Sequence, residues 1–161
     1  MAPLSLIPQV GLPGPLLLAV LVSYLLGSVP FGLLLTRALK GQDLRQLGSG
    51  NIGATNTMRA LGRGWGLASF ALDCAKGWAS VFVIAPALVG VTLDSHPGVL
   101  CGAAAVLGHC FPVYLGFKGG KGVATACGAI VAVDPLIVLS AGLVWVATLK
   151  LTRYVGLASI L

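Results

Sequence analysis

Long apolar stretches separated by short polar segments make up most of the chain. The apolar runs cover residues 16–35, 65–89, 99–117, 123–133 and 136–149, and a further run begins near Tyr154. A helix needs about 20 mainly apolar residues to cross the hydrocarbon core of a bilayer, so the fourth run is short for a full span. The pattern predicts an all-α fold, a polytopic transmembrane helix bundle with about five to six helices.

The composition supports a membrane protein with one domain over residues 1–161. Of the 161 residues, 57% are hydrophobic and 9% are charged, and the mean hydropathy is +0.99. Soluble domains carry roughly 25% charged residues. The net charge of +6 does not indicate a nucleic-acid partner, because the basic residues stand at the ends of apolar runs, where they set membrane topology.

The charged residues also predict the orientation of the chain. Cytoplasmic loops of membrane proteins are enriched in Lys and Arg. If the N-terminus lies outside, nine of the ten basic residues fall on the cytoplasmic side, namely Arg37, Lys40, Arg45, Arg59, Arg63, Lys118, Lys121, Lys150 and Arg153. Asp94 and Asp134 then mark the outer side, and Lys76 alone lies inside a helix.

A glycine-rich polar segment at residues 116–125 separates two of the apolar runs. Its glycines allow sharp backbone bends that turn several N–H groups toward one point, and Lys118 and Lys121 add two positive charges. The segment also precedes a predicted helix, whose first N–H groups are unpaired and attract anions. It does not match the Walker A pattern. These features favour a phosphate site; the alternative is a basic turn that anchors two helices at the membrane face.

A second polar segment covers residues 48–62. A short helix is predicted from Ala54 to Leu61, with Asn51 or Ser49 near its start as the cap. On this helix Thr55 and Arg59 lie four residues apart and face the same way. An arginine beside hydroxyl and amide groups suits a phosphate or a carboxylate; the alternative is a capped surface helix, which explains Arg59 less well.

Two charged residues and a histidine within the apolar runs stand out. Asp73 and Lys76 are three residues apart, on one face of a helix, where they can neutralise each other. A structural pair, completed by water or a loop carbonyl, is favoured over a functional one. His109 lies toward the cytoplasmic end of its helix, where hydrogen bonding is favoured over proton transfer.

At these segments the chain resembles the bacterial acyl-phosphate:glycerol-3-phosphate acyltransferases, the PlsY family. The resemblance rests on several motifs, which are the stretches 27–32, 48–56, 59–62, 72–73, 76–77, 108–109, 112–113, 116–125 and 153–155. It implies a seven-helix fold and transfer of an acyl group from acyl phosphate to the sn-1 hydroxyl of glycerol 3-phosphate. The products are lysophosphatidic acid and inorganic phosphate.

The resemblance also implies roles for particular residues. Ser49 and Arg59 match residues important for activity, and the stretch 118–122 matches the motif linked to glycerol 3-phosphate binding. Two departures stand out: Gly156 follows the Arg-Tyr-Val triplet where the family has serine, and the family's C-terminal helix and last motif are not found, so we expect a C-terminally truncated domain. The rival hypotheses are an anion channel, which would need polar residues across the whole membrane, and a catalytically silent homologue.

Together these arguments predict a membrane acyltransferase without metal or cofactor. The predicted catalytic residues are Ser49, Arg59, Lys118 and His109, and the predicted substrate-binding residues are Asn51, Thr55, Asn56, Gly119, Gly120, Lys121, Gly122 and Thr125. Acyl phosphate, glycerol 3-phosphate and the lipid bilayer are the expected partners of a monomer in the bacterial cytoplasmic membrane. We expect the acceptor's own phosphate to take the hydroxyl proton, with His109 as the less favoured base.

Overall fold

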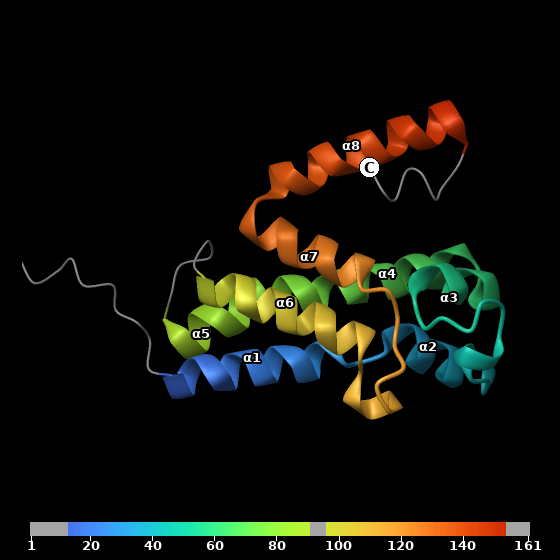
Figure 1. Ribbon diagram of the computed structural model, residues 1–161. Helices are drawn as coiled ribbons and strands as arrows, with labels where there is room; N and C mark the ends of the chain where they lie inside the picture. Colours follow the sequence, from blue (N-terminus) through green and yellow to red (C-terminus); the bar gives the residue numbers. More distant parts are fainter. Residues whose placement is uncertain (1–12, 91–95, 154–161) are drawn as a thin grey trace, which may run out of the picture.

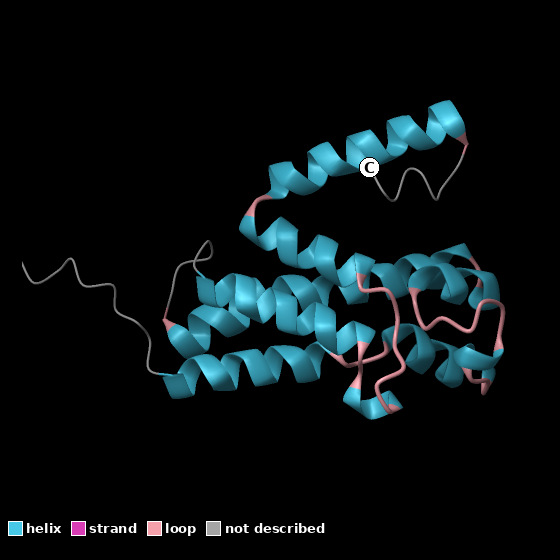
Figure 2. Cartoon of the chain, viewed as in Figure 1, coloured by secondary structure: helices cyan, strands magenta, loops and turns pink. Residues whose placement is uncertain are grey.

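The computed structural model describes residues 13–90 and 96–153, and within these ranges every regular element is helical (Figures 1 and 2). The α-helices are α1 (Pro13–Gly27), α2 (Phe31–Lys40), α3 (Ala54–Leu61), α4 (Arg63–Ala79), α5 (Ala85–Val89), α6 (His96–Cys110), α7 (Val123–Val133) and α8 (Pro135–Thr152). Short 3-10 turns cover Leu44–Gln46 and Val113–Leu115, and a π-helical turn covers Ser80–Ile84. The predicted all-α class is confirmed.

Four stretches of the described chain are helical, long and apolar enough to cross a membrane. They are Gly14–Lys40, Arg63–Val89, His96–Leu115 and Pro135–Thr152. The helix α7 is apolar but has only 11 residues, as its short run predicted. The run that begins near Tyr154, and the turn with Asp94, lie outside the described residues.

Two of the predicted runs are not continuous α-helices. The first breaks between α1 and α2 at Pro30, which has no N–H to donate within a helix. The second widens into the π-helical turn before α5, where Pro86 stands near the helix start. A widened turn accommodates a proline that would otherwise clash with the preceding turn. Both breaks therefore have a cause in the sequence.

Paired glycines bring the main helices into close contact. In the α4/α7 pair, a Cβ at Gly77 would overlap the carbonyl of Thr125, and a Cβ at Gly128 would overlap that of Cys74. The α1/α6 pair repeats the arrangement, because Gly27 lies against a carbonyl of α6 and Gly108 against one of α1. Small residues allow such close backbone approach between membrane helices.

The polar segments gather at one end of the bundle, which we call the loop end. Figure 1 shows α2, α3, the start of α4, the end of α6 and the start of α7 there, on the right of the view. The opposite end contains α5, the start of α6 and the turn between α7 and α8, where the Asp134 side chain accepts a hydrogen bond of 2.8 Å from the Leu136 amide. The helix α8 has no buried residue and lies apart from the bundle (Figure 1).

Candidate functional site

Asn56 organises the polar segment at residues 48–62, which we call the first loop because it comes first in the chain. Its side chain is 2% exposed, and its Oδ1 accepts a hydrogen bond from the Ser49 amide at 3.1 Å. Its Nδ2 lies within 3.1 Å of the carbonyl oxygens of Leu44, Leu47 and Asn51. Both polar atoms of the side chain are therefore used inside the loop. The predicted contact between Asn56 and substrate stays a prediction; what this structure shows is that the residue shapes the loop.

The predicted helix cap is also corrected. The helix α3 begins where predicted, but its N-cap is Gly53, and no side chain caps it. Asn51 Oδ1 accepts a hydrogen bond of 2.8 Å from the Gly53 amide, one position before the helix. Asn51 thus forms a local turn that leads into α3, and its side-chain oxygen is already occupied.

The Asn56→Ala substitution is expected to lower the free energy of unfolding by about 1–3 kcal/mol, because it leaves buried loop carbonyls and one amide without partners. Thermal unfolding in detergent measures the change. Thr55→Ala is the matched control: Thr55 is the neighbouring residue and is exposed, so its substitution should stay within about 0.5 kcal/mol of the parent. Equal stability of the two variants would contradict the organising role of Asn56.

Ser49, Thr55 and Arg59 are exposed at the loop end. Gly48, directly before Ser49, has a φ of +53° and turns the chain sharply. A Cβ at Gly48 would lie 3.9 Å from Cδ of Arg59, so the arginine stem passes over the residue that precedes Ser49. These three side chains therefore form the accessible face of the first loop.

An apolar cluster joins the two polar loops. Leu33, Leu44 and Ile52 are each at most 1% exposed, and Leu115 packs against them. Leu115 lies in the 3-10 turn that precedes the glycine-rich loop, whereas Ile52 belongs to the polar segment 48–62 and Leu44 to the 3-10 turn that leads into it. The two segments predicted to bind anions are therefore neighbours in space.

The glycine-rich loop is fastened to the end of α6. The Gly119 amide donates to the carbonyl of Cys110 at 3.1 Å, and the Gly120 amide donates to that of His109 at 3.0 Å. That these two amides bind phosphate stays a prediction; in this structure they donate to helix carbonyls. The glycines are needed for close approach, because a Cβ at Gly119 would overlap the His109 carbonyl.

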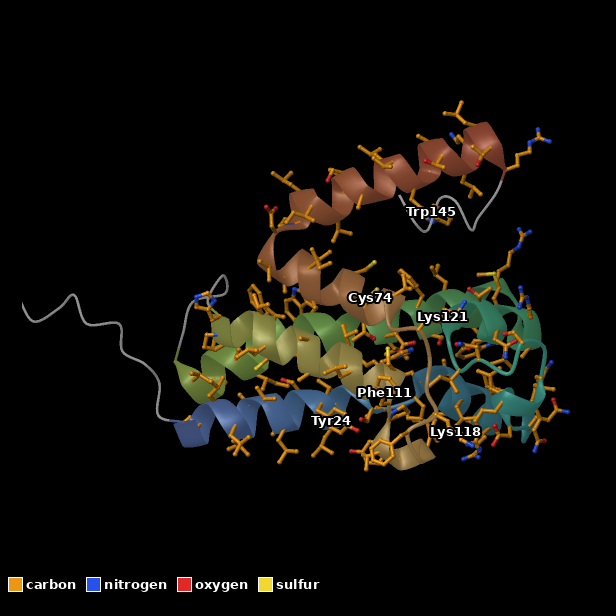
Figure 3. All side chains as sticks on the ribbon, viewed as in Figure 1. Tyr24, Cys74, Phe111, Lys118, Lys121 and Trp145 are labelled. Atoms are coloured by element: carbon orange, nitrogen blue, oxygen red, sulfur yellow. The ribbon has the colours of Figure 1, made fainter. Side chains whose placement is uncertain are left out.

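The remaining residues of the second loop differ in accessibility. Lys118 and Lys121 are exposed, with Lys121 beside the start of α7 and Lys118 near the 3-10 turn (Figure 3). Gly122 has φ +75° and directly precedes α7, so it shapes the turn into that helix. Thr125 is fully buried. Its predicted contact with substrate stays a prediction, and in this structure the side chain is inaccessible.

A buried polar cluster lies beneath the glycine-rich loop. Lys76 Nζ is 2.8 Å from Asp73 Oδ1, 2.9 Å from the Val29 carbonyl oxygen and 2.9 Å from His109 Nδ1. The predicted ion pair and its completion by a loop carbonyl are confirmed. The link to His109 was not predicted, because it joins α4 to α6 across 33 positions of the chain.

A second charged cluster, also missed from the sequence, lies at the loop end. The Asp43 carboxylate is 2.7 Å from both the Arg37 and Arg45 guanidinium groups. Hydrogen bonds from the Arg45 side chain, followed by those from its backbone and from Arg37, hold the pKa of Asp43 well below its usual range. The same pairing raises the pKa of Arg45. Asp43 therefore offsets part of the positive charge on the first loop.

Comparisons with known proteins agree with this arrangement. A family model described as glycerol-3-phosphate acyltransferase matches residues 17–161. Among curated relatives, the glycerol-3-phosphate acyltransferase of Desulforudis audaxviator is 51% identical over 147 residues, covering 90% of this chain and 71% of the relative. That of Aquifex aeolicus is 50% identical and covers 89% of this chain and 73% of the relative.

Two solved structures are also similar. The glycerol 3-phosphate form of PlsY (YgiH), an integral membrane glycerol 3-phosphate acyltransferase, has a TM-score of 0.79 and 48% identity. Its lysophosphatidic acid form has a TM-score of 0.78 and 47% identity. Each match covers 90% of this chain and 70% of the solved one. The chain therefore belongs to the integral membrane glycerol-3-phosphate acyltransferase family.

Proposed function

We propose that this protein transfers a fatty acyl group from acyl phosphate to the sn-1 hydroxyl of glycerol 3-phosphate. The hydroxyl oxygen forms an ester bond with the acyl carbon, and the bond between that carbon and the phosphate oxygen breaks. The products are lysophosphatidic acid and inorganic phosphate. The observation that carries the proposal is that two exposed basic loops are neighbours at one end of an apolar bundle. Two phosphate groups and an acyl chain could be bound together there.

The reaction requires the protein mainly to align the two substrates and to stabilise the negative charge that develops. Acyl phosphate is a mixed anhydride, so its carbonyl is activated and its phosphate leaves readily. The protein needs to hold the two substrates in line and to stabilise negative charge on the carbonyl oxygen and the leaving phosphate. No covalent intermediate with the protein is required. The hydroxyl proton passes to the phosphate of the acceptor.

Five exposed side chains have roles in this proposal. Lys118 and Lys121 bind one phosphate, and Arg59 binds the other with its planar fork of N–H donors. Ser49, which follows the glycine that packs near the Arg59 stem, donates to the reacting carbonyl or to the leaving group. Thr55 lies four residues before Arg59 on the helix α3 and adds a hydroxyl to the same face.

The proposed setting is a monomer in the bacterial cytoplasmic membrane, with the N-terminus outside and the loop end in the cytoplasm. The support is the concentration of basic residues in the segments at the loop end, which is typical of cytoplasmic loops. Glycerol 3-phosphate is a charged, water-soluble molecule, so it would reach exposed loops more readily than the interior of the bundle.

Phosphate release from palmitoyl phosphate by the purified protein in detergent tests the reaction. Release is expected to require glycerol 3-phosphate. Arg59→Ala should lower kcat/KM about 10- to 100-fold, because a hydrogen bond to a charged group contributes about 1.5–3 kcal/mol. Arg63→Ala is the matched control, since Arg63 is an exposed arginine four residues further on, and it should leave kcat/KM within about twofold. Release that does not depend on glycerol 3-phosphate would contradict the proposal, and so would equal loss in both variants.

A further inference from the structure

The hydrogen bond between Lys76 and His109 determines which ring nitrogen carries the proton. Lys76 Nζ lies 2.9 Å from His109 Nδ1, whereas Asp73 Oδ1 lies 3.5 Å from the same nitrogen. The buried Asp73 carboxylate at 2.8 Å needs a cationic partner, and an ammonium has three N–H donors and no lone pair with which to accept. Lys76 is therefore the donor in this bond, and Nδ1 is the acceptor.

The surroundings of Lys76 fix this arrangement. Its Nζ also donates to the Val29 carbonyl at 2.9 Å and lies 5.7 Å from the centre of the Phe31 ring. The side chains of Asp73 and Lys76 are 2% and 1% exposed, so water does not compete for the ammonium. The Lys76 ammonium is thus surrounded by a carboxylate, a carbonyl and an aromatic ring, in addition to His109.

The other ring nitrogen faces the glycine-rich loop. A neutral imidazole carries one proton on its two ring nitrogens. Because Nδ1 of His109 accepts a hydrogen bond, the proton is on Nε2. A Cβ at Gly120 would overlap Nε2, so the ring, which is 4% exposed, fits against the loop only because this residue has no side chain. The bond from the Gly120 amide to the His109 carbonyl holds the loop over the same residue.

We propose that Lys76 is a positioning residue that fixes the proton of His109 on Nε2, so that this N–H donates a hydrogen bond to the phosphate-bearing substrate beside Gly120. Asp73 supports it by neutralising the ammonium. An Nε2 that already carries a proton cannot take one from the acceptor hydroxyl, so His109 acts as a donor and not as the base. The inference rests on the proposed function for the identity of the bound substrate.

Nuclear magnetic resonance of the protein in detergent, labelled with ¹⁵N-histidine, tests the tautomer without any turnover. The chain has two histidines, and His96→Gln removes the signal of the other. At pH 7, His109 is expected to show a protonated Nε2 and an unprotonated Nδ1. Addition of glycerol 3-phosphate should shift the Nε2 resonance. A protonated Nδ1, or an unchanged Nε2 at saturating glycerol 3-phosphate, would overturn the proposal.

Three substitutions of His109 separate a donor from a base. Gln can place an amide N–H close to the position of Nε2, but an amide is not a base; Asn has the same amide on a shorter side chain. His109→Gln is therefore expected to retain kcat within about tenfold, whereas His109→Ala and His109→Asn should lose about 100-fold, the typical effect of removing one preorganised donor. Equal loss in the Gln and Ala variants, with folding intact by thermal unfolding, would contradict the donor role.

The two tests also separate this inference from the proposed reaction. If acyl phosphate is not the acyl donor, the parent protein will not release phosphate from palmitoyl phosphate, but the tautomer and the shift on adding glycerol 3-phosphate will still be observed. If His109 is not a donor, the parent will turn over and the tautomer or the shift will differ.

Discussion

Lys76→Met, with Asp73 left in place, is expected to lower the free energy of unfolding by about 3–5 kcal/mol, because it leaves an uncompensated buried carboxylate. Both side chains of the pair are nearly inaccessible, so water cannot solvate the remaining charge. Unfolding by denaturant in mixed micelles measures the loss. The double variant Asp73→Leu with Lys76→Met should recover most of it, since replacing a buried ion pair by apolar residues is often close to neutral.

The control for this experiment is Lys150→Met in the last turn of α8, where the lysine is exposed. The same substitution there should change the free energy of unfolding by no more than about 0.5 kcal/mol. If Lys76→Met and Lys150→Met unfold alike, the ion pair does not contribute to the packing of α4.

Gly128→Ala is expected to lower the free energy of unfolding by about 1–3 kcal/mol or more, because the added methyl group overlaps the Cys74 carbonyl and forces α4 and α7 apart. A backbone atom cannot move aside as a flexible side chain can. The glycine-rich loop leads directly into α7, so activity should fall in parallel. Thermal unfolding and the phosphate-release assay measure the two effects.

Gly142→Ala on α8 is the matched control, because a Cβ at Gly142 has no neighbour within 4 Å. In an exposed helix, alanine is about 0.5–1 kcal/mol more favourable than glycine. Gly142→Ala should therefore be neutral or slightly stabilising. If the two variants are equally stable, the close crossing of α4 and α7 is not a constraint on the fold.

The positions of the helices could be predicted because hydropathy and length decide them. The run at 123–133 correctly predicted a short helix, and α3 lies over Ala54–Leu61 as expected. The break at Pro30 was missed because residues 16–35 are apolar throughout, and periodicity does not distinguish one helix from two. Pro30 itself could have indicated the break, because proline interrupts helices.

The candidate site could be predicted in its outline and not in its internal hydrogen bonds. The sequence shows which residues are polar and basic, and these identified both loops. It does not show what a buried amide or hydroxyl meets in the fold. Asn56 and Thr125 were predicted to bind substrate, and both are buried: Asn56 bonds to carbonyls of its own loop, and Thr125 lies against Gly77 of α4.

The bonds that the Gly119 and Gly120 amides make to α6 have an electrostatic consequence for the proposed anion site. The carbonyls at the C-terminus of a helix carry the equivalent of about half a negative charge, and those of His109 and Cys110 lie directly behind the basic loop. Without hydrogen-bond partners, these carbonyl oxygens would repel a phosphate. The two glycine amides therefore favour anion binding indirectly: by covering the pole of α6, they leave the positive field of Lys118 and Lys121 less opposed.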